Sequence, residues 1–105
     1  QVVRLLPGQK IAYVTDAVYT PENAERIVEL VRAADLLFIE AAFMEKDAGR
    51  AGAKFHLTAR QAGWLAGRAG ARTVVPFHHS PIYNDQVDNL HRELEEAFAS
   101  ARAQL

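Results

Sequence analysis

Four residues with acid–base or metal-binding side chains follow predicted strands or open a predicted helix: Asp16, Glu40, His56 and His78. In an α/β sheet such positions converge on one edge, at the carboxyl ends of the strands. Two carboxylates and two imidazoles meeting there suit a divalent cation, with zinc or manganese as the first candidates. Asp16 has two oxygens and could bridge two cations, and a neutral His78 could fill one coordination position.

Each of these residues also has a plainer interpretation. An aspartate after a strand often binds the backbone amides of a turn, and a lone histidine there is most often a turn or surface residue. His79 and His91 keep that interpretation. The spacing is not a local metal signature such as Cys-x-x-Cys, and the chain contains no cysteine.

Length and composition limit the class of protein. The chain has 105 residues and begins with Gln1, so we expect 1–105 to be a single partial domain cut from a longer protein. A net charge of −1 gives no basic field typical of a general nucleic-acid binder, although another part of a larger protein could hold RNA. No run is apolar enough to span a membrane, and we expect a cytoplasmic protein with no membrane partner.

The elements that must position these residues alternate along the chain. Residues 1–5 and 10–15 are strand-prone and flank the turn dipeptide Pro7-Gly8, which predicts a hairpin. Helical periodicity and apolar runs predict the remaining elements. Helices are expected over 20–35, 58–70 and from 84 or 85 to 101, and strands over 36–39 and 72–77.

These elements predict an α/β fold: a β-hairpin, then alternating helices and strands, then a final helix. The unbroken apolar run 36–39 favours a central strand covered on both faces. Pro76 cannot donate to a strand ladder, so 72–77 should lie at an edge or a break. The charged, glycine-containing segment 43–55 is expected to be a mobile surface loop or a weak helical turn.

Segments spread over nearly the whole chain resemble the metallo-β-lactamase-fold hydrolases, most closely the ribonuclease Z (tRNase Z) and arylsulfatase-like branch. Tyr13-Val-Thr-Asp16 resembles the strand whose aspartate bridges two metals. Ile39-Glu-Ala-Ala-Phe43 resembles the His-Glu-Ala-Thr-Phe segment of ribonuclease Z, and His56-Leu-Thr-Ala59 resembles the segment that follows it. His78-His-Ser-Pro-Ile-Tyr83 resembles His-Phe-Ser-Pro-Arg-Tyr. The resemblance implies the C-terminal half of an αββα sandwich.

The resemblance also implies a function: a hydrolase with two divalent metals, zinc first and manganese second, acting as a phosphodiesterase or as an endonuclease in tRNA processing. Asp16 would be the bridging ligand and His78 a ligand of the second metal. His56 would donate a proton to the leaving oxygen, with Glu40 as its orienting partner. The substrate-binding residues implied by the resemblance are Ser80 and Tyr83.

The chain departs from the family pattern at several positions. Ile39 stands where the family has histidine, His79 where it has phenylalanine, and Ile82 where it has an arginine that could bind phosphate. These changes weaken the case for tRNA processing and make another ester substrate comparably compatible. The His-x-His-x-Asp-His cluster of the family's N-terminal half is absent, so the isolated chain should bind metal weakly and hydrolyse nothing.

Two other interpretations remain open. Half of a sandwich would leave apolar strand faces such as 36–39 in water, which favours self-association as a dimer or pairing with the N-terminal half of the fold. Alternatively, a receiver-like signalling domain would use Asp16 as phosphoacceptor. However, His78-His79 stands where such a domain needs lysine, and no acidic pair precedes Asp16.

Overall fold

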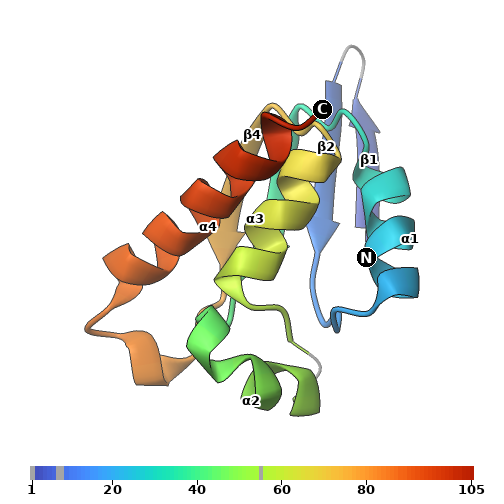
Figure 1. The fold of residues 1–105 in the computed structure, drawn as a ribbon. Helices are drawn as coiled ribbons and strands as arrows, with labels where there is room; N and C mark the ends of the chain where they lie inside the picture. The colour runs from blue at the N-terminus through green and yellow to red at the C-terminus, as the bar shows by residue number, and fades with distance from the viewer. Residues whose placement is uncertain (1, 7–8, 55) are drawn as a thin grey trace.

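The chain forms a four-stranded sheet with helices packed on one face (Figure 1). This computed structural model describes residues 2–6, 9–54 and 56–105. The sheet order is β1-β2-β3-β4, with the first pair antiparallel and the other two pairs parallel. The strands are β1 (Val2–Leu6), β2 (Gln9–Val14), β3 (Leu36–Glu40) and β4 (Thr73–Phe77). The predicted hairpin is confirmed, while Pro7-Gly8 lies outside the described residues.

Helices connect the parallel strands and define the edge where chemistry can gather. The elements are α1 (Pro21–Val31), α2 (Ala48–Ala53), α3 (Ala59–Arg68), α4 (Val87–Arg102) and the short 3-10 turns η1 (Glu45–Asp47) and η2 (Pro81–Tyr83). Figure 1 shows α1, α3 and α4 against the sheet and α2 beyond the carboxyl ends of the strands. The segment predicted as a loop or weak helical turn therefore contains η1 and α2.

Side-chain caps fix where α1 and α3 begin. The Thr20 hydroxyl accepts the N–H of Asn23 at 3.1 Å, and Pro21 occupies the first turn of α1. The Thr58 hydroxyl accepts the N–H of Gln61 at 3.0 Å, and the Gln61 side chain accepts the Thr58 N–H at 2.9 Å. These caps satisfy amides that have no partner within a helix. Both predicted helix starts are confirmed.

The start of the last helix was predicted wrongly. α4 begins after Gln86, which makes no side-chain cap, and not at Asn84 or Asp85. The Asn84 side-chain oxygen is instead 3.0 Å from Nε2 of His79. Ser80 caps the preceding turn η2 by accepting the Ile82 N–H at 3.4 Å. Local capping after β4 therefore stabilises η2, and the cap position of α4 lies at Gln86, one or two residues beyond the predicted Asp85 or Asn84.

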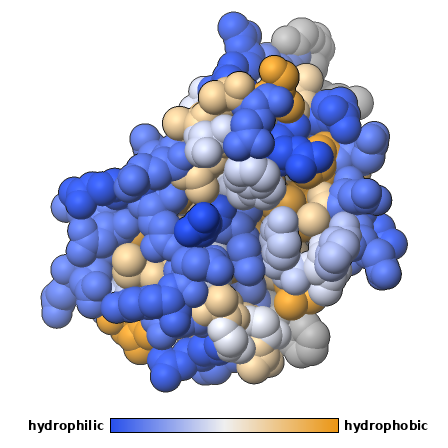
Figure 2. Space-filling model, viewed as in Figure 1, coloured by the Kyte–Doolittle hydropathy of each residue, from blue (hydrophilic) through white to orange (hydrophobic). Residues whose placement is uncertain are grey.

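Glycines in α3 allow α4 to pack very closely. A Cβ added to Gly63 would lie 2.1 Å from the carbonyl oxygen of Leu94, and one added to Gly67 would lie 2.6 Å from Cβ of Ala101. Leu94 and Ala101 are fully buried. No helix among the described residues has the length and apolarity needed to cross a membrane. Figure 2 shows that the helix-bearing face is largely hydrophilic, with separate small apolar patches.

The sheet has one covered face and one partly exposed face. Leu37 and Ile39 point to the helices and are fully buried. Phe38 is only partly buried, and it stacks on Tyr13 with ring centroids 4.8 Å apart. Tyr13 is 40% exposed. The prediction that β3 is covered on both faces is therefore wrong for the described residues, because helices lie on one side only (Figure 1).

Candidate metal centre

A buried carboxylate organises the edge formed by the carboxyl ends of the strands. Glu40, the last residue of β3, is 0% exposed. Its Oε2 accepts the backbone N–H of Asp16 at 3.0 Å, and its Oε1 lies 2.6 Å from Nδ1 of His78. An ionised carboxylate can only accept, so Nδ1 of His78 carries the hydrogen in this contact. Glu40 therefore ties the ends of β2 and β4 to β3.

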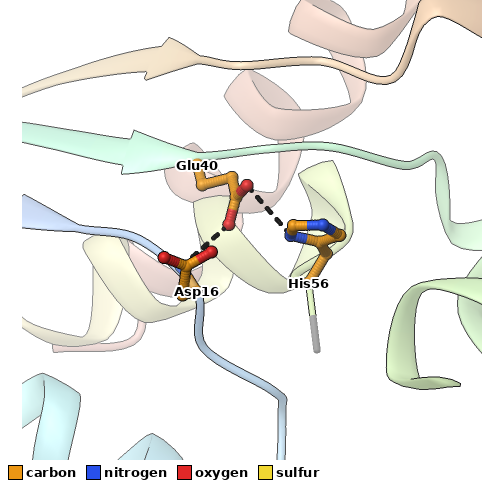
Figure 3. A group of neighbouring side chains, drawn as sticks. All are labelled: Asp16, Glu40 and His56. Carbon is orange, nitrogen blue, oxygen red and sulfur yellow. Dashed lines mark hydrogen bonds and ion pairs between the residues drawn. The ribbon is translucent and has the colours of Figure 1, made fainter. Parts of the chain in front are cut away.

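The same oxygen also faces His56, which comes from the segment before α3 (Figure 3). Nδ1 of His56 lies 2.9 Å from Oε1 of Glu40, an ion-pair distance. Its alignment is not that of a hydrogen bond, and this buried nitrogen has no hydrogen-bond partner among the described residues. The imidazoles of His56 and His78 stand perpendicular, with centroids 5.9 Å apart. Oε1 of Glu40 thus contacts Nδ1 of both imidazoles, so in each ring Nε2 is the nitrogen that does not contact this oxygen.

Asp16 and His78 share an unusual backbone conformation. Their φ angles are +54° and +60°, in the left-handed region that residues with a Cβ seldom adopt. Asp16 lies two residues after the end of β2, and His78 directly follows the last residue of β4. Such a conformation costs about 1–3 kcal/mol and persists where surrounding contacts over-determine it, commonly at functional sites. Here the Glu40 contacts hold both residues.

The donor set fits a divalent cation. One potential ligand atom from each of Asp16, Glu40 and His56 lies within 4.8 Å of the other two, and Figure 3 shows these side chains converging from separate elements. Asp16 is exposed, so its carboxylate remains accessible from outside. Carboxylate oxygens and imidazole nitrogens are ligands that zinc and manganese accept. Within this set, the buried Nδ1 of His56 has no hydrogen-bond partner among the described residues.

The two predicted substrate-binding residues lie in very different surroundings. Ser80 is partly exposed at the start of η2, two residues after His78. Tyr83 is 2% exposed and its hydroxyl donates to Asp47. Burial, and then this hydrogen bond, raise the pKa of Tyr83 above its ordinary value. The contact anchors η1 to η2, and a role for either residue in substrate binding stays a prediction.

Sequence reasoning placed the four chemistry-bearing residues at one edge, and the structure brings them together. The pairing of Glu40 with His56 was expected from the family resemblance, but the contacts of Glu40 with His78 and with the Asp16 amide were not. Sequence reasoning also missed the positive φ angles of Asp16 and His78. The sequence signal for these contacts was the position of Glu40 directly after an apolar run, because a buried carboxylate there must find polar partners. His79 contacts Asn84, and His91 lies within α4, as expected for residues without an assigned role.

Comparison with known proteins gives a family match and similar sequences. Residues 2–79 match the family described as the beta-lactamase superfamily domain. Ribonuclease Z from Kineococcus radiotolerans is 44% identical over 97 residues, covering 92% of this chain and 27% of that protein. Ribonuclease Z from Porphyromonas gingivalis is 38% identical over 92 residues, covering 88% of this chain and 29% of that protein. The chain therefore spans less than a third of the length of these curated relatives.

A solved structure supports the same fold. The metallo-beta-lactamase fold protein YhfI from Bacillus subtilis superimposes with a TM-score of 0.76 at 24% sequence identity. The match covers 89% of this chain and 35% of that chain. Together these findings confirm the resemblance and the α/β fold class that were predicted from the sequence.

Proposed function

Because this chain belongs to the beta-lactamase superfamily domain family, we propose that it supplies part of a dinuclear-metal hydrolase that cleaves phosphodiesters, in the manner of ribonuclease Z. The family match removes the receiver-domain interpretation. The observation that carries the proposal is the buried Glu40 carboxylate, which gathers His56, His78 and the Asp16 amide at one sheet edge. Ribonuclease Z relatives at 38–44% identity support the choice of substrate class.

In this proposal Asp16 would hold both cations, and His78 would be a ligand of the second cation. The His78 Nδ1–H contact with Glu40 leaves Nε2 as the atom with a free lone pair. Two bound cations, zinc or manganese, would activate water and stabilise charge on the phosphoryl oxygens. Glu40 and His56 belong to the same cluster of donor atoms, but in this proposal they serve in proton transfer and not in metal binding. The N-terminal part of the fold would supply the other ligands.

His56 acts as the proton donor to the leaving oxygen. Glu40 faces its Nδ1 at 2.9 Å, and a carboxylate at that distance favours a hydrogen on this nitrogen. Nε2 is then the atom that gives its proton to the departing alkoxide. The side chain of His56 is 23% exposed, so the ring is held by its surroundings while one edge stays accessible.

The missing cover of the sheet supports the proposal that residues 1–105 are a partial domain. Phe38 and Tyr13 lie on the partly exposed face of the sheet, opposite the helices. In the complete protein, the N-terminal half of the same fold would pack on this face. For the isolated chain we expect self-association through the same surface, because exposed apolar area favours burial. Light scattering on the chain should show a dimer, and a stable monomer would contradict this.

A second ester substrate is favoured by one position. Ile82 is 52% exposed in η2, close to Ser80. The ribonuclease Z segment that residues 78–83 resemble has an arginine at this position. An apolar side chain there cannot bind a phosphate by charge. A carboxylic or other ester with an apolar flank is therefore the alternative substrate class.

A chimera tests the proposal. The segment of Kineococcus ribonuclease Z that matches this chain would be replaced by residues 1–105, which adds the N-terminal metal-binding half. With zinc or manganese, the chimera should hydrolyse bis(p-nitrophenyl) phosphate faster than p-nitrophenyl acetate, and the isolated chain should hydrolyse neither. The reverse preference would favour the second ester class.

Variants of the chimera assign the roles. His56→Ala should lower kcat by about 10²–10⁴-fold, the usual contribution of a general acid. Asp16→Ala should abolish turnover together with metal binding. The matched control is His91→Ala, which changes a histidine within α4 and should leave kcat unaltered. A chimera that binds metal and keeps full activity after His56→Ala would refute the assignment.

A further inference from the structure

In the segment between β3 and α3, the acidic side chains make contacts within the fold and the basic side chains are exposed. This segment runs from Met44 to Lys54, through η1 and α2, and contains two acidic and three basic residues. The acidic residues are engaged by the rest of the fold. Oε1 of Glu45 accepts the hydroxyl of Thr58 at 2.8 Å, and Asp47 accepts the hydroxyl of Tyr83. The basic residues, by contrast, all face outward.

The three cations are Lys46, Arg50 and Lys54, here called the basic stripe. All three are exposed, and none forms an ion pair with any residue in the described ranges. Lys46 lies in η1, Arg50 in α2 and Lys54 at the C-cap of α2, so the three cations follow one another along two consecutive short elements. The stripe is a local concentration of positive charge on a chain whose net charge is −1.

The basic stripe is attached to the candidate metal centre. The backbone N–H of His56 donates to the carbonyl of Ala51 in α2 at 2.8 Å. Lys54 ends α2 two residues before His56. Figure 1 places α2 beyond the carboxyl ends of the strands, at the same edge of the sheet as the centre. A polymer lying on the stripe would therefore continue toward His56.

Within α2, the residues beside Arg50 are small and include no large apolar side chain. Cβ atoms added at Gly49 and Gly52 would meet nothing within 4 Å. The remaining residues of α2 besides these glycines and Arg50 are alanines. A polyanion backbone can therefore approach closely. Membrane-surface helices pair basic residues with bulky apolar anchors, which α2 lacks, so the composition favours nucleic acid over a lipid surface.

We infer that Lys46, Arg50 and Lys54 bind successive backbone phosphates of a single-stranded nucleic acid and guide it to the centre at Glu40 and His56. The inference deepens the proposed function and rests on it for the class of partner. The contacts are to phosphate and carry no base specificity. They set affinity and register along the strand, while the centre sets the chemistry.

Fluorescence anisotropy of the full chain with a short labelled single-stranded RNA tests this, without added metal and over a series of salt concentrations. The triple variant Lys46→Gln, Arg50→Gln, Lys54→Gln should bind more weakly. Each phosphate contact in a single strand contributes about 0.7 to the slope of log K against log salt, so the slope should become shallower by about 2. Circular dichroism verifies that the variant is folded.

A charge-matched triple variant provides the control: Arg26→Gln, Arg68→Gln, Arg72→Gln. Arg26 and Arg68 are exposed on α1 and at the end of α3, and Arg72 is exposed just before β4, at the opposite end of the strand from the candidate metal centre. The control variant removes the same net charge as the stripe variant. It should change the slope of log K against log salt by less than half as much as the stripe variant does. Equal losses in the two triple variants, no RNA binding by the wild-type chain, or binding only to phosphatidylserine vesicles would each overturn the inference.

The assay separates this inference from the proposed function. Binding to the stripe needs no metal and no turnover, so His56→Ala should bind RNA as the wild type does. A chimera that fails to hydrolyse phosphodiesters, with the stripe-dependent slope intact, would refute the proposed function alone. Suppose instead that the chimera hydrolyses phosphodiesters but the stripe variant has the same slope of log K against log salt as the wild type. That result would refute only the role of the basic stripe in RNA binding.

Discussion

Replacing Glu40 with glutamine perturbs the contact on which the site depends. The carboxylate is 0% exposed, accepts the Asp16 N–H at 3.0 Å and accepts Nδ1–H of His78 at 2.6 Å. Glutamine keeps the shape and one acceptor oxygen, which can still bind the amide, but it loses the charge facing the imidazoles. A hydrogen bond to a charged group contributes about 1.5–3 kcal/mol. Removal of a buried charge offsets part of this loss. We therefore expect Glu40→Gln to lower the free energy of unfolding by about 1.5 kcal/mol, or about tenfold in the folding equilibrium.

Urea unfolding at neutral pH, followed by circular dichroism, measures this difference as a lower midpoint with an unchanged slope. The control is Glu29→Gln, which removes a largely exposed ion pair with Arg32 and should cost less than about 1 kcal/mol. The reasoning would be refuted if Glu40→Gln were as stable as the wild type, or cost no more than the control. Either result would mean that the buried carboxylate does not hold the strand ends together.

Two further substitutions test the packing around the site. Gly63→Ala should destabilise the chain by at least about 1–3 kcal/mol through overpacking, because its Cβ would lie 2.1 Å from the Leu94 carbonyl oxygen. Gly52→Ala, with open space at that position, should cost nothing or stabilise, and equal thermal midpoints for the two variants would contradict the account. Burial and the Asp47 contact raise the pKa of Tyr83, so its contribution to stability is complete below the unfolded value of 10.0 and declines as the pH rises above it. Tyr83→Phe should therefore be less stable than the wild type at neutral pH in urea titrations, with a gap that narrows above about pH 10, whereas a constant gap would contradict the shift.

Much of the fold could be predicted because local chemistry determines it. Thr20 with Pro21, and Thr58 with Gln61, cap helices through side chains only three residues away in sequence. Gly70 ends α3 with a φ of +71°, which glycine adopts without strain. Such signals do not depend on distant parts of the chain, and the structure confirms each of them.

Other features depend on partners far apart in sequence, so local pattern could not reveal them. The positive φ angles of Asp16 and His78 occur at residues that contact Glu40, which lies 24 and 38 residues away. The later start of α4 accompanies the turn η2, whose Tyr83 is buried and donates to Asp47, 36 residues away. The half-covered sheet could not be read from the apolar run 36–39, because periodicity does not tell which side is covered.

In the proposed site, Asp16 and His78 coordinate the same pair of cations. Anomalous diffraction from crystals of the chimera grown with zinc tests this claim most directly. We expect two zinc peaks at the strand ends, with one Asp16 carboxylate oxygen within about 2.0–2.2 Å of each ion and a His78 ring nitrogen bound to one of them. Zinc bound only by the N-terminal cluster, with Asp16 and His78 outside coordination distance, would contradict the claim.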